Sequence, residues 1–247
     1  MNDKRSTPDT ELLLKELKEL NIDLSDSQTD SFVKYYNLLC EWNSFMNLTA
    51  ITDWDEVVTK HFTDSLCLTK CINNMTDMSY SVLDIGTGAG FPGIPLKIAF
   101  PGLKLTLMDS LNKRIGFLNE VISSLGLLDI CAIHSRAEAL GHNKDYRQNF
   151  DIVVSRAVAN MTVLSELSLP YVKKDGYFIC YKSDKTEEEY DMAKKAIDIL
   201  GGRVENIVEF DLPKTDIRRK LYVIRKIKDT PDKYPRKEGT PSKSPLY

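Results

Sequence analysis

Four glycines and one acidic residue lie in a short stretch of the sequence, LDIGTGAGFPG at residues 83–93. Glycines at 86, 88 and 90 allow the backbone to turn sharply and to approach a bound molecule without a Cβ in the way. Asp84 precedes these glycines, and Asp109 ends the next apolar run, where a carboxylate can accept hydrogen bonds from the hydroxyls of a ribose. The spacing predicts a strand, a nucleotide-binding turn and a helix.

Two cofactors fit this turn. GAGFPG matches the G-x-G-x-x-G pattern of a nicotinamide dinucleotide site, which would make the protein an oxidoreductase. However, the carboxylate of Asp84 would repel a pyrophosphate, and Pro92 and Pro95 occupy positions where a helix N-terminus would offer free amides. Glu138 follows the third apolar run, where it either begins a helix or lies near an adenine amine. The three acids together favour S-adenosylmethionine and methyl transfer.

The fourth apolar run, DIVVSRAVAN at residues 151–160, narrows the methyl acceptor. It lacks the D/N-P-P-Y/F/W motif of enzymes that methylate exocyclic amines. Enzymes that methylate carbon 5 of a pyrimidine need a cysteine nucleophile near this position, but the nearest cysteine, Cys180, lies in the next run. Ring nitrogen N7 of guanine needs neither device, because its lone pair can attack the methyl group directly once positioned. Arg156 is a candidate for holding the methionine carboxylate or the acceptor's O6, with a strand-end salt bridge as the alternative. Lys182, after the fifth run, would face the same cleft and help to manage charge.

The elements that must position these residues follow from the periodicity. Apolar side chains three and four apart predict helices over 9–20 and 26–45, and Asp53, with Glu56 three residues later, is the expected N-cap of a third. From there strands and helices alternate, ending in a hairpin, so a mostly parallel seven-stranded sheet flanked by helices is expected. We expect a helical extension over 1–75, a core over 76–228 and a basic tail over 229–247.

Composition and charge limit the partners. The net charge is −3, yet residues 211–247 hold 11 Lys and Arg against 5 Asp and Glu, which indicates either contact with a polyanion or a solvated tail. The sequence has no apolar run long enough for a membrane helix and no signal-peptide pattern, so a cytoplasmic protein is expected. Five scattered cysteines and three dispersed histidines favour neither disulfides nor a metal site.

With these residues identified, the chain closely resembles the RsmG (GidB) family of bacterial small-subunit rRNA methyltransferases over nearly its whole length. The segments that carry the resemblance, in order, are NLTAI at 47–51, HFTDSL at 61–66, LDIGTGAGFPGIPL at 83–96, LMDSLNKRIGFL at 107–118, SRAEAL at 135–140, SRAVAN at 155–160 and YPRKEGTPSKSPL at 234–246.

The resemblance implies a Rossmann-like class I methyltransferase that transfers a methyl group from S-adenosylmethionine to guanine N7 in the 530 loop of 16S rRNA. His61 and Asp64 would support the cleft from beneath. The substrate would be 16S rRNA or a small-subunit particle, and the enzyme would act as a monomer. A non-catalytic RNA-binding module is the alternative. The expected cofactor-binding residues are Asp84, Gly86, Thr87, Gly88, Gly90, Phe91, Asp109, Ser110, Leu111, Ala137, Glu138 and Arg156. The expected RNA-binding residues are Arg114, Arg136, Arg218, Arg219, Arg236 and Lys237, with the tail lying across the substrate face.

Overall fold

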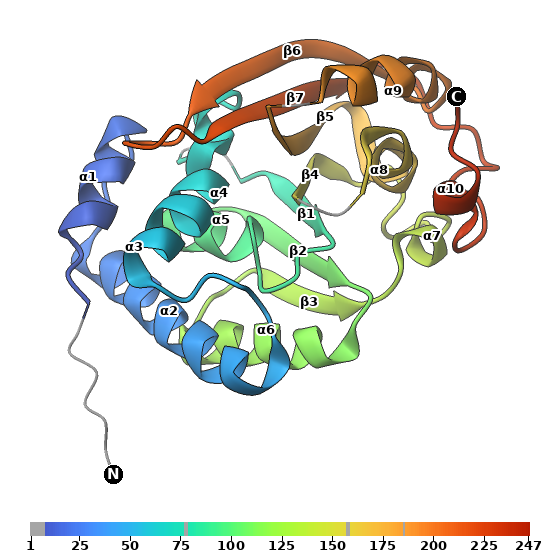
Figure 1. Cartoon of the computed structure of the whole chain (residues 1–247). Helices are drawn as coiled ribbons and strands as arrows, with labels where there is room; N and C mark the ends of the chain where they lie inside the picture. The colour runs from blue at the N-terminus through green and yellow to red at the C-terminus, as the bar shows by residue number, and fades with distance from the viewer. Residues whose placement is uncertain (1–7, 77–78, 157–158, 185) are drawn as a thin grey trace.

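The computed structural model describes residues 8–76, 79–156, 159–184 and 186–247, and its centre is one seven-stranded sheet (Figure 1). The strand order is β3-β2-β1-β4-β5-β7-β6. Strands β1 to β5 are parallel, whereas β7 runs antiparallel to both β5 and β6. The predicted mostly parallel sheet with a final hairpin is therefore confirmed. The strands are β1 (Ser81–Ile85), β2 (Lys104–Asp109), β3 (Ile130–His134), β4 (Phe150–Arg156), β5 (Val172–Ser183), β6 (Gly202–Asp211) and β7 (Arg218–Lys226).

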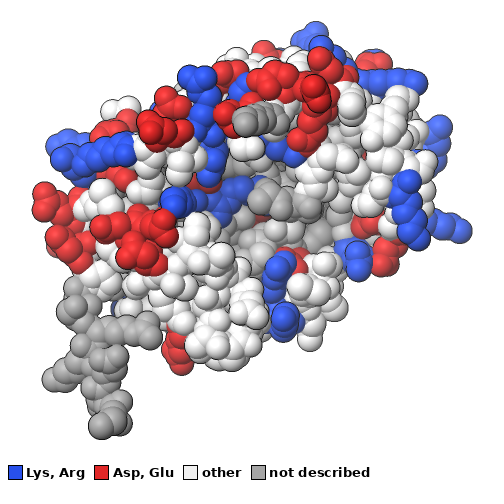
Figure 2. Space-filling view, in the orientation of Figure 1, with Lys and Arg blue, Asp and Glu red and all other residues white. Residues whose placement is uncertain are grey.

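Helices cover both faces of the sheet, as expected for parallel strands joined by crossovers (Figure 1). One face packs against α5 (Gly93–Ala99) and α6 (Asn112–Ser124), together with the N-terminal helices. The other packs against α8 (Met161–Ser168) and α9 (Glu187–Ile199), with the short α7 (Ala137–Leu140) and η3 (Leu169–Tyr171) beside them. A space-filling view of the same orientation shows a hollow in the middle of this side of the molecule, with Lys and Arg side chains around it (Figure 2).

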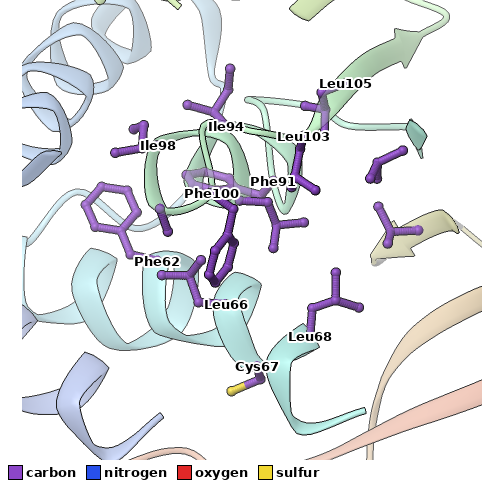
Figure 3. Packing of buried hydrophobic residues seen from close by; sticks show 14 of the residues in the cluster. Phe62, Leu66, Cys67, Leu68, Phe91, Ile94, Ile98, Phe100, Leu103 and Leu105 are labelled. Atoms are coloured by element: carbon purple, nitrogen blue, oxygen red, sulfur yellow. The ribbon is translucent and has the colours of Figure 1, made fainter. Parts of the chain in front are cut away.

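The N-terminal helices share a hydrophobic core with the sheet. They are α1 (Glu11–Glu19), α2 (Asp26–Met46), α3 (Trp54–Val57), the π-helical turn η1 (Val58–Thr63), α4 (Asp64–Leu66) and the 3₁₀ turn η2 (Cys67–Lys70). Phe62, Leu66 and Leu68 pack against Ile94 and Phe100 on and after α5 (Figure 3). The expected extension over residues 1–75, of which residues 1–7 lie outside the described part, is thus joined to the core by buried apolar contacts.

Capping residues account for two of the helix starts. Ser25 and Gln28 form a capping box at the start of α2, whose bounds match the predicted helix. Asp53 accepts a hydrogen bond from the backbone of Glu56, as expected of an N-cap. The predicted helix after Asp53 passes through the π-helical turn η1, a feature that often marks functional sites. The periodic pattern gave no sign of this irregularity.

The basic tail is fixed to the α7–α8 side of the core. Arg147 donates to the carbonyl oxygens of Thr230 and Tyr234, both at 2.7 Å. Arg236 donates to the carboxylate of Glu166, which is 1% exposed. After this ion pair the chain forms α10 (Thr240–Lys243), next to α8 (Figure 1). No helix among the described residues is long and apolar enough to cross a membrane.

Candidate active site

The glycine turn after β1 has the conformation that its sequence predicts. Gly86, Gly88 and Gly90 have φ values of +69°, +62° and +99°, a region that side-chain-bearing residues rarely adopt. A Cβ at position 90 would also lie 2.5 Å from Cγ1 of Ile94 and 2.9 Å from the hydroxyl of Tyr35. Tyr35 in turn donates to the carbonyl of Ala89 at 2.5 Å. Tyr35, a buried residue of α2, therefore fixes the turn by a hydrogen bond and leaves no room for a side chain at position 90.

Asp84 lies beneath this turn and is fully buried. Its Oδ2 accepts hydrogen bonds from Thr87 Oγ1 at 2.6 Å and from the backbone N–H of Gly93 at 2.9 Å. Gly93 begins α5, so this carboxylate uses the first amide that the helix would otherwise offer to a phosphate. Burial raises the pKa of Asp84 to about 6, and Oδ1 has no hydrogen-bond partner among the described residues. A buried acceptor without a partner fits a ligand ammonium or a bridging water.

Asp109 occupies the end of β2, as predicted, and is 2% exposed. Its carboxylate accepts from the backbone N–H groups of Gly88 and Leu111, each at 2.9 Å, and from Arg114 Nη1 at 3.1 Å. A carboxylate has about four acceptor positions, so one remains for a ribose hydroxyl. Arg114, expected on the RNA side, is therefore placed at the cofactor end of β2 by this ion pair.

A first cavity of about 200 Å³ lies beside the turn, at the carboxyl ends of β1 and β2. Its wall contains Glu138, whose Oε1 accepts from the backbone N–H of Gly239 in the tail at 3.1 Å. Several residues expected at the cofactor are not part of this wall: Asp84, Thr87, Gly88, Gly90, Phe91, Leu111 and Arg156. The cavity is lined by Ile85, Gly86, Met108, Asp109, Ser110, Ser135, Arg136, Ala137, Glu138, Ala159, Val163, Leu167 and Ser242.

A second cavity of about 510 Å³ lies at the ends of β4 and β5, within the usual volume range of ligand sites. Lys182 lines it and donates to the carbonyl of Ala159 at 2.7 Å. Ala159 itself lines the first cavity, so this hydrogen bond joins the linings of the two cavities. Its neighbours Ala157 and Val158 in the SRAVAN segment lie outside the described residues. The second cavity is lined by Ile51, Lys60, His61, Asp64, Arg156, Tyr181, Lys182, Ser183, Thr186, Glu189 and Arg219.

Arg156 is held in the second cavity by three groups of the π-helical segment and its end. Nη1 donates to Asp64 Oδ2 at 2.9 Å and to the carbonyl of Lys60 at 3.1 Å, and Nη2 lies 3.3 Å from Nδ1 of His61. The guanidinium also lies 5.1 Å from the ring centre of Phe91. Phe91 is buried, and its ring stacks on His61. It therefore supports Arg156 from below instead of lining the cofactor cavity.

His61 and Asp64 are more central than the sequence indicated. Both line the second cavity, and Asp64 also accepts from Arg219 Nε at 3.1 Å. Burial, with a further contribution from Arg156, lowers the pKa of His61 to about 4, so the imidazole is neutral at pH 7. The HFTDSL motif contained a usable signal, because residues three apart on a helix point to the same side. No such local signal in the sequence pointed to their partners, Arg156 on β4 and Arg219 on β7.

Comparison with known proteins identifies the family. The family model described as GidB, rRNA small subunit methyltransferase G, matches residues 28–221. The chain belongs to the GidB family. A protein named ribosomal RNA small subunit methyltransferase G from Lachnoclostridium phytofermentans is 56% identical over 238 residues, which cover 96% of this chain and 98% of the relative. A protein of the same name from Staphylococcus aureus is 51% identical over 236 residues, covering 96% and 98% of the two chains.

Solved structures support the fold alone. A SAM dependent methyltransferase from Aquifex aeolicus superposes with a TM-score of 0.53 at 19% identity, covering 72% of this GidB chain and 96% of that protein. A ribosomal protein L11 methylase from Lactobacillus delbrueckii superposes with a TM-score of 0.51 at 16% identity, covering 68% and 80%. The expected class I methyltransferase fold is confirmed.

Apart from Arg114, which is paired with Asp109, the predicted RNA-contacting residues of this GidB chain fall into two groups. Arg136, Arg218 and Lys237 are exposed, the first two paired with Glu238 at 2.6 Å and Asp211 at 3.4 Å. Arg219 and Arg236 are instead bound to Asp64 and Glu166, two buried carboxylates. The described residues contain no group of three or more His, Cys, Asp or Glu side chains suited to a metal ion.

Proposed function

We propose that the protein transfers the methyl group of S-adenosylmethionine to N7 of a guanosine in the 530 loop of 16S rRNA. One structural observation carries the proposal: a hydrogen bond from Lys182 to the carbonyl of Ala159 joins the linings of two cavities of different character. The first cavity has the carboxylates that a nucleoside cofactor needs, and the second has cations and a neutral imidazole. Membership of the GidB family, with relatives named for methylation of small-subunit rRNA, supports the same reaction.

The residues of the first cavity fit the cofactor. The free acceptor position of Asp109 suits a ribose hydroxyl, and Glu138 suits the adenine amine. Asp84 lies beneath the turn and outside the cavity lining, so its unpartnered Oδ1 would reach the ammonium only through a water. When bound, S-adenosylmethionine supplies a methyl group made electrophilic by its sulfonium. Gly86 brings the backbone close, and Ser110 and Ala137 complete the walls of the first cavity. A dinucleotide fits less well because Asp84 already takes the first amide of α5.

The second cavity is then the place of the acceptor base. N7 of guanine carries a lone pair and no proton, so no general base is required and the protein acts by positioning. Arg156 is held rigidly by Asp64 and the carbonyl of Lys60, which suits a role in orienting the methionine carboxylate or O6 of the base. His61, neutral at pH 7, adds no positive charge beside a purine that becomes cationic.

The outer surface would bind the rest of the RNA. Lys and Arg side chains gather around the hollow in Figure 2, and exposed cations such as Arg136, Arg218 and Lys237 can contact phosphates. We propose that a monomer in the cytoplasm acts on 16S rRNA or on a small-subunit particle. Residues 1–75 would supply His61 and Asp64, residues 76–228 would supply the cofactor cavity, and the tail over 229–247 would complete its rim.

Mapping of N7-methylguanosine in 16S rRNA from cells with and without the gene tests the reaction. The proposal predicts that one modified guanosine in the 530 loop disappears in the deletion strain and returns when the gene is supplied. An unchanged modification pattern would contradict it. Calorimetric titration of the purified protein with S-adenosylmethionine separates the rivals, since a non-catalytic RNA-binding module would show no heat of binding and a dinucleotide enzyme would bind NAD instead.

A further inference from the structure

The second cavity contains an ion pair whose acidic member, Glu189, has no role in the reaction described above. Lys182 Nζ lies 2.5 Å from Oε1 of Glu189, and both side chains line the cavity. The side chains are 14% and 25% exposed, respectively. A pair that is partly buried in this way is not an ordinary surface salt bridge, and it faces the space that would receive the base.

Both members of the pair are held in place by backbone groups. Lys182, at the end of β5, also donates to the carbonyl of Ala159. Glu189 lies in the first turn of α9, where the helix dipole favours a carboxylate, and its Oε1 accepts from the backbone N–H of Met161 at the start of α8. Three elements therefore fix the orientation of this pair.

The pair retains hydrogen-bonding capacity toward the cavity. An ammonium has three donors, and Lys182 uses one on Ala159 and one on Glu189. Glu189 Oε2 accepts no hydrogen bond from the part of the chain that the structure describes. Among the described residues, one N–H of the Lys182 ammonium and Oε2 of Glu189 therefore remain without a partner at the cavity lining.

Guanine is the base that matches a donor next to a carboxylate. Its Watson–Crick edge presents O6 as an acceptor, followed by N1–H and the 2-amino group as donors. Adenine presents the reverse order at the same positions, an amine where the ammonium lies and a bare N1 where the carboxylate lies. Bases with the wrong pattern leave buried polar groups unpaired, which is the basis of strong discrimination.

Resting on the methyl transfer proposed above, we propose that Lys182 and Glu189 select guanine, with Lys182 donating to O6 and Glu189 accepting from N1–H and the 2-amino group. O6 lies between N1 and N7 on the rim of the purine, so a base held by its Watson–Crick edge keeps N7 accessible. The carboxylate of Glu189 would also lie beside the purine. Because the purine gains positive charge when N7 is methylated, the negative charge of the carboxylate is favourable there.

Small subunits reconstituted with altered 16S rRNA test this inference. The target guanosine is replaced by inosine, which keeps N7, O6 and N1–H but lacks the 2-amino group, or by 2,6-diaminopurine, which lacks O6 and N1–H. We expect the wild-type rate of methyl transfer to fall about tenfold or more with each analogue. In Glu189→Gln, the guanosine rate should fall and the guanosine-to-inosine ratio should approach one. Glu188→Gln, one residue away and outside the cavity, is the matched control and should keep both the guanosine rate and the guanosine-to-inosine ratio of the wild-type protein.

The rate ratio is measured within one protein, so a loss of folded material does not change it. If wild-type protein methylates inosine and guanosine equally, or if Glu189→Gln keeps the full ratio, the assignment is wrong. If Glu189→Gln is inactive, the rates of the wild-type protein on guanosine, inosine and 2,6-diaminopurine decide whether the assignment stands. If wild-type protein fails even on unmodified subunits while it binds S-adenosylmethionine, the proposed function has failed, and the assignment falls with it.

Discussion

Nη1 of Arg156 lies 2.9 Å from Oδ2 of Asp64, although 92 residues separate them in the sequence. The other oxygen of the same carboxylate accepts from Arg219. One buried acid of the N-terminal helical segment therefore fixes two cations, one from β4 and one from β7, at the edge of the second cavity. This arrangement makes the helical segment part of the site.

Replacing Asp64 with Asn should disorder both cations. The amide cannot neutralise two guanidinium groups, and breaking a buried pair by removing one partner destabilises a protein by about 3–5 kcal/mol. We expect a lower melting temperature and a fall in methyl transfer of more than tenfold, with smaller loss of cofactor affinity. Thermal melts, calorimetry and rate assays check this. Asp55→Asn, on the exposed side of the same segment, should behave as wild type; equal losses in both variants would contradict the role of Asp64.

Replacing Asp109 with Ala should weaken the binding of S-adenosylmethionine. The loss of a charged hydrogen bond corresponds to about 1.5–3 kcal/mol, or roughly 10- to 150-fold in affinity. The backbone N–H groups of Gly88 and Leu111 would also lose their acceptor, so the turn should loosen. Calorimetric titration measures the effect, with Glu120→Ala on the exposed side of α6 as the control. Unchanged affinity in the Asp109 variant would refute its assignment to the cofactor.

Asp84→Asn should remove a pH dependence of stability. The pKa of Asp84 is raised from 3.8 to about 6 by burial, so between pH 4 and 6 the native protein binds more protons than the unfolded chain. Its free energy of unfolding therefore falls as pH rises through this window, by about 3 kcal/mol at most, and levels off above it. The variant should be the more stable protein at pH 7.5, with no such advantage at pH 4. Denaturant unfolding at several pH values checks this. An equal difference in the free energy of unfolding between the variant and the wild-type protein at pH 4 and at pH 7.5 would count against the prediction.

The neighbouring cations Arg236 and Lys237 should have different roles. Arg236→Ala leaves the buried carboxylate of Glu166 unpaired, so a loss of about 3 kcal/mol or more is expected, reduced when Glu166→Gln is added. Lys237→Ala should leave stability unchanged but lower the salt slope of RNA binding by roughly 0.7–0.9. Denaturant unfolding and binding titrations over a range of salt concentrations separate the two effects. A stable Arg236→Ala protein would show that this ion pair does not anchor the tail.

Local patterns predicted much of the fold. The bounds of α2 followed from apolar spacing, and the turn at Gly86 to Gly90 followed from glycines between a strand and a helix. Asp109 was located by its distance from that turn. These features depend on neighbours in sequence, so periodicity and turn chemistry were sufficient to find them.

Features that depend on distant partners could not be predicted. The burial of Asp84 follows from where α5 begins, and the position of Arg114 follows from the carboxylate that it meets. Arg236 looked like a phosphate-binding residue because nothing in the sequence indicates that Glu166 lies beneath it. Glu189 lies in the acidic first turn of α9, and only the packing of α9 against the ends of β5 and α8 brings it to the cavity.

The π-helical turn at Val58–Thr63 has a consequence for how the chain tolerates changes in length. Such a turn holds one residue more than an ordinary helical turn, and one residue corresponds to a rotation of about 100° around the helix axis. Deletion of a single residue here would convert the turn to ordinary helix and keep the segments before and after it in phase, but the carbonyl of Lys60 and the ring of His61 inside the turn would rotate relative to Arg156. Insertions and deletions in this segment should therefore abolish activity in proteins that still fold.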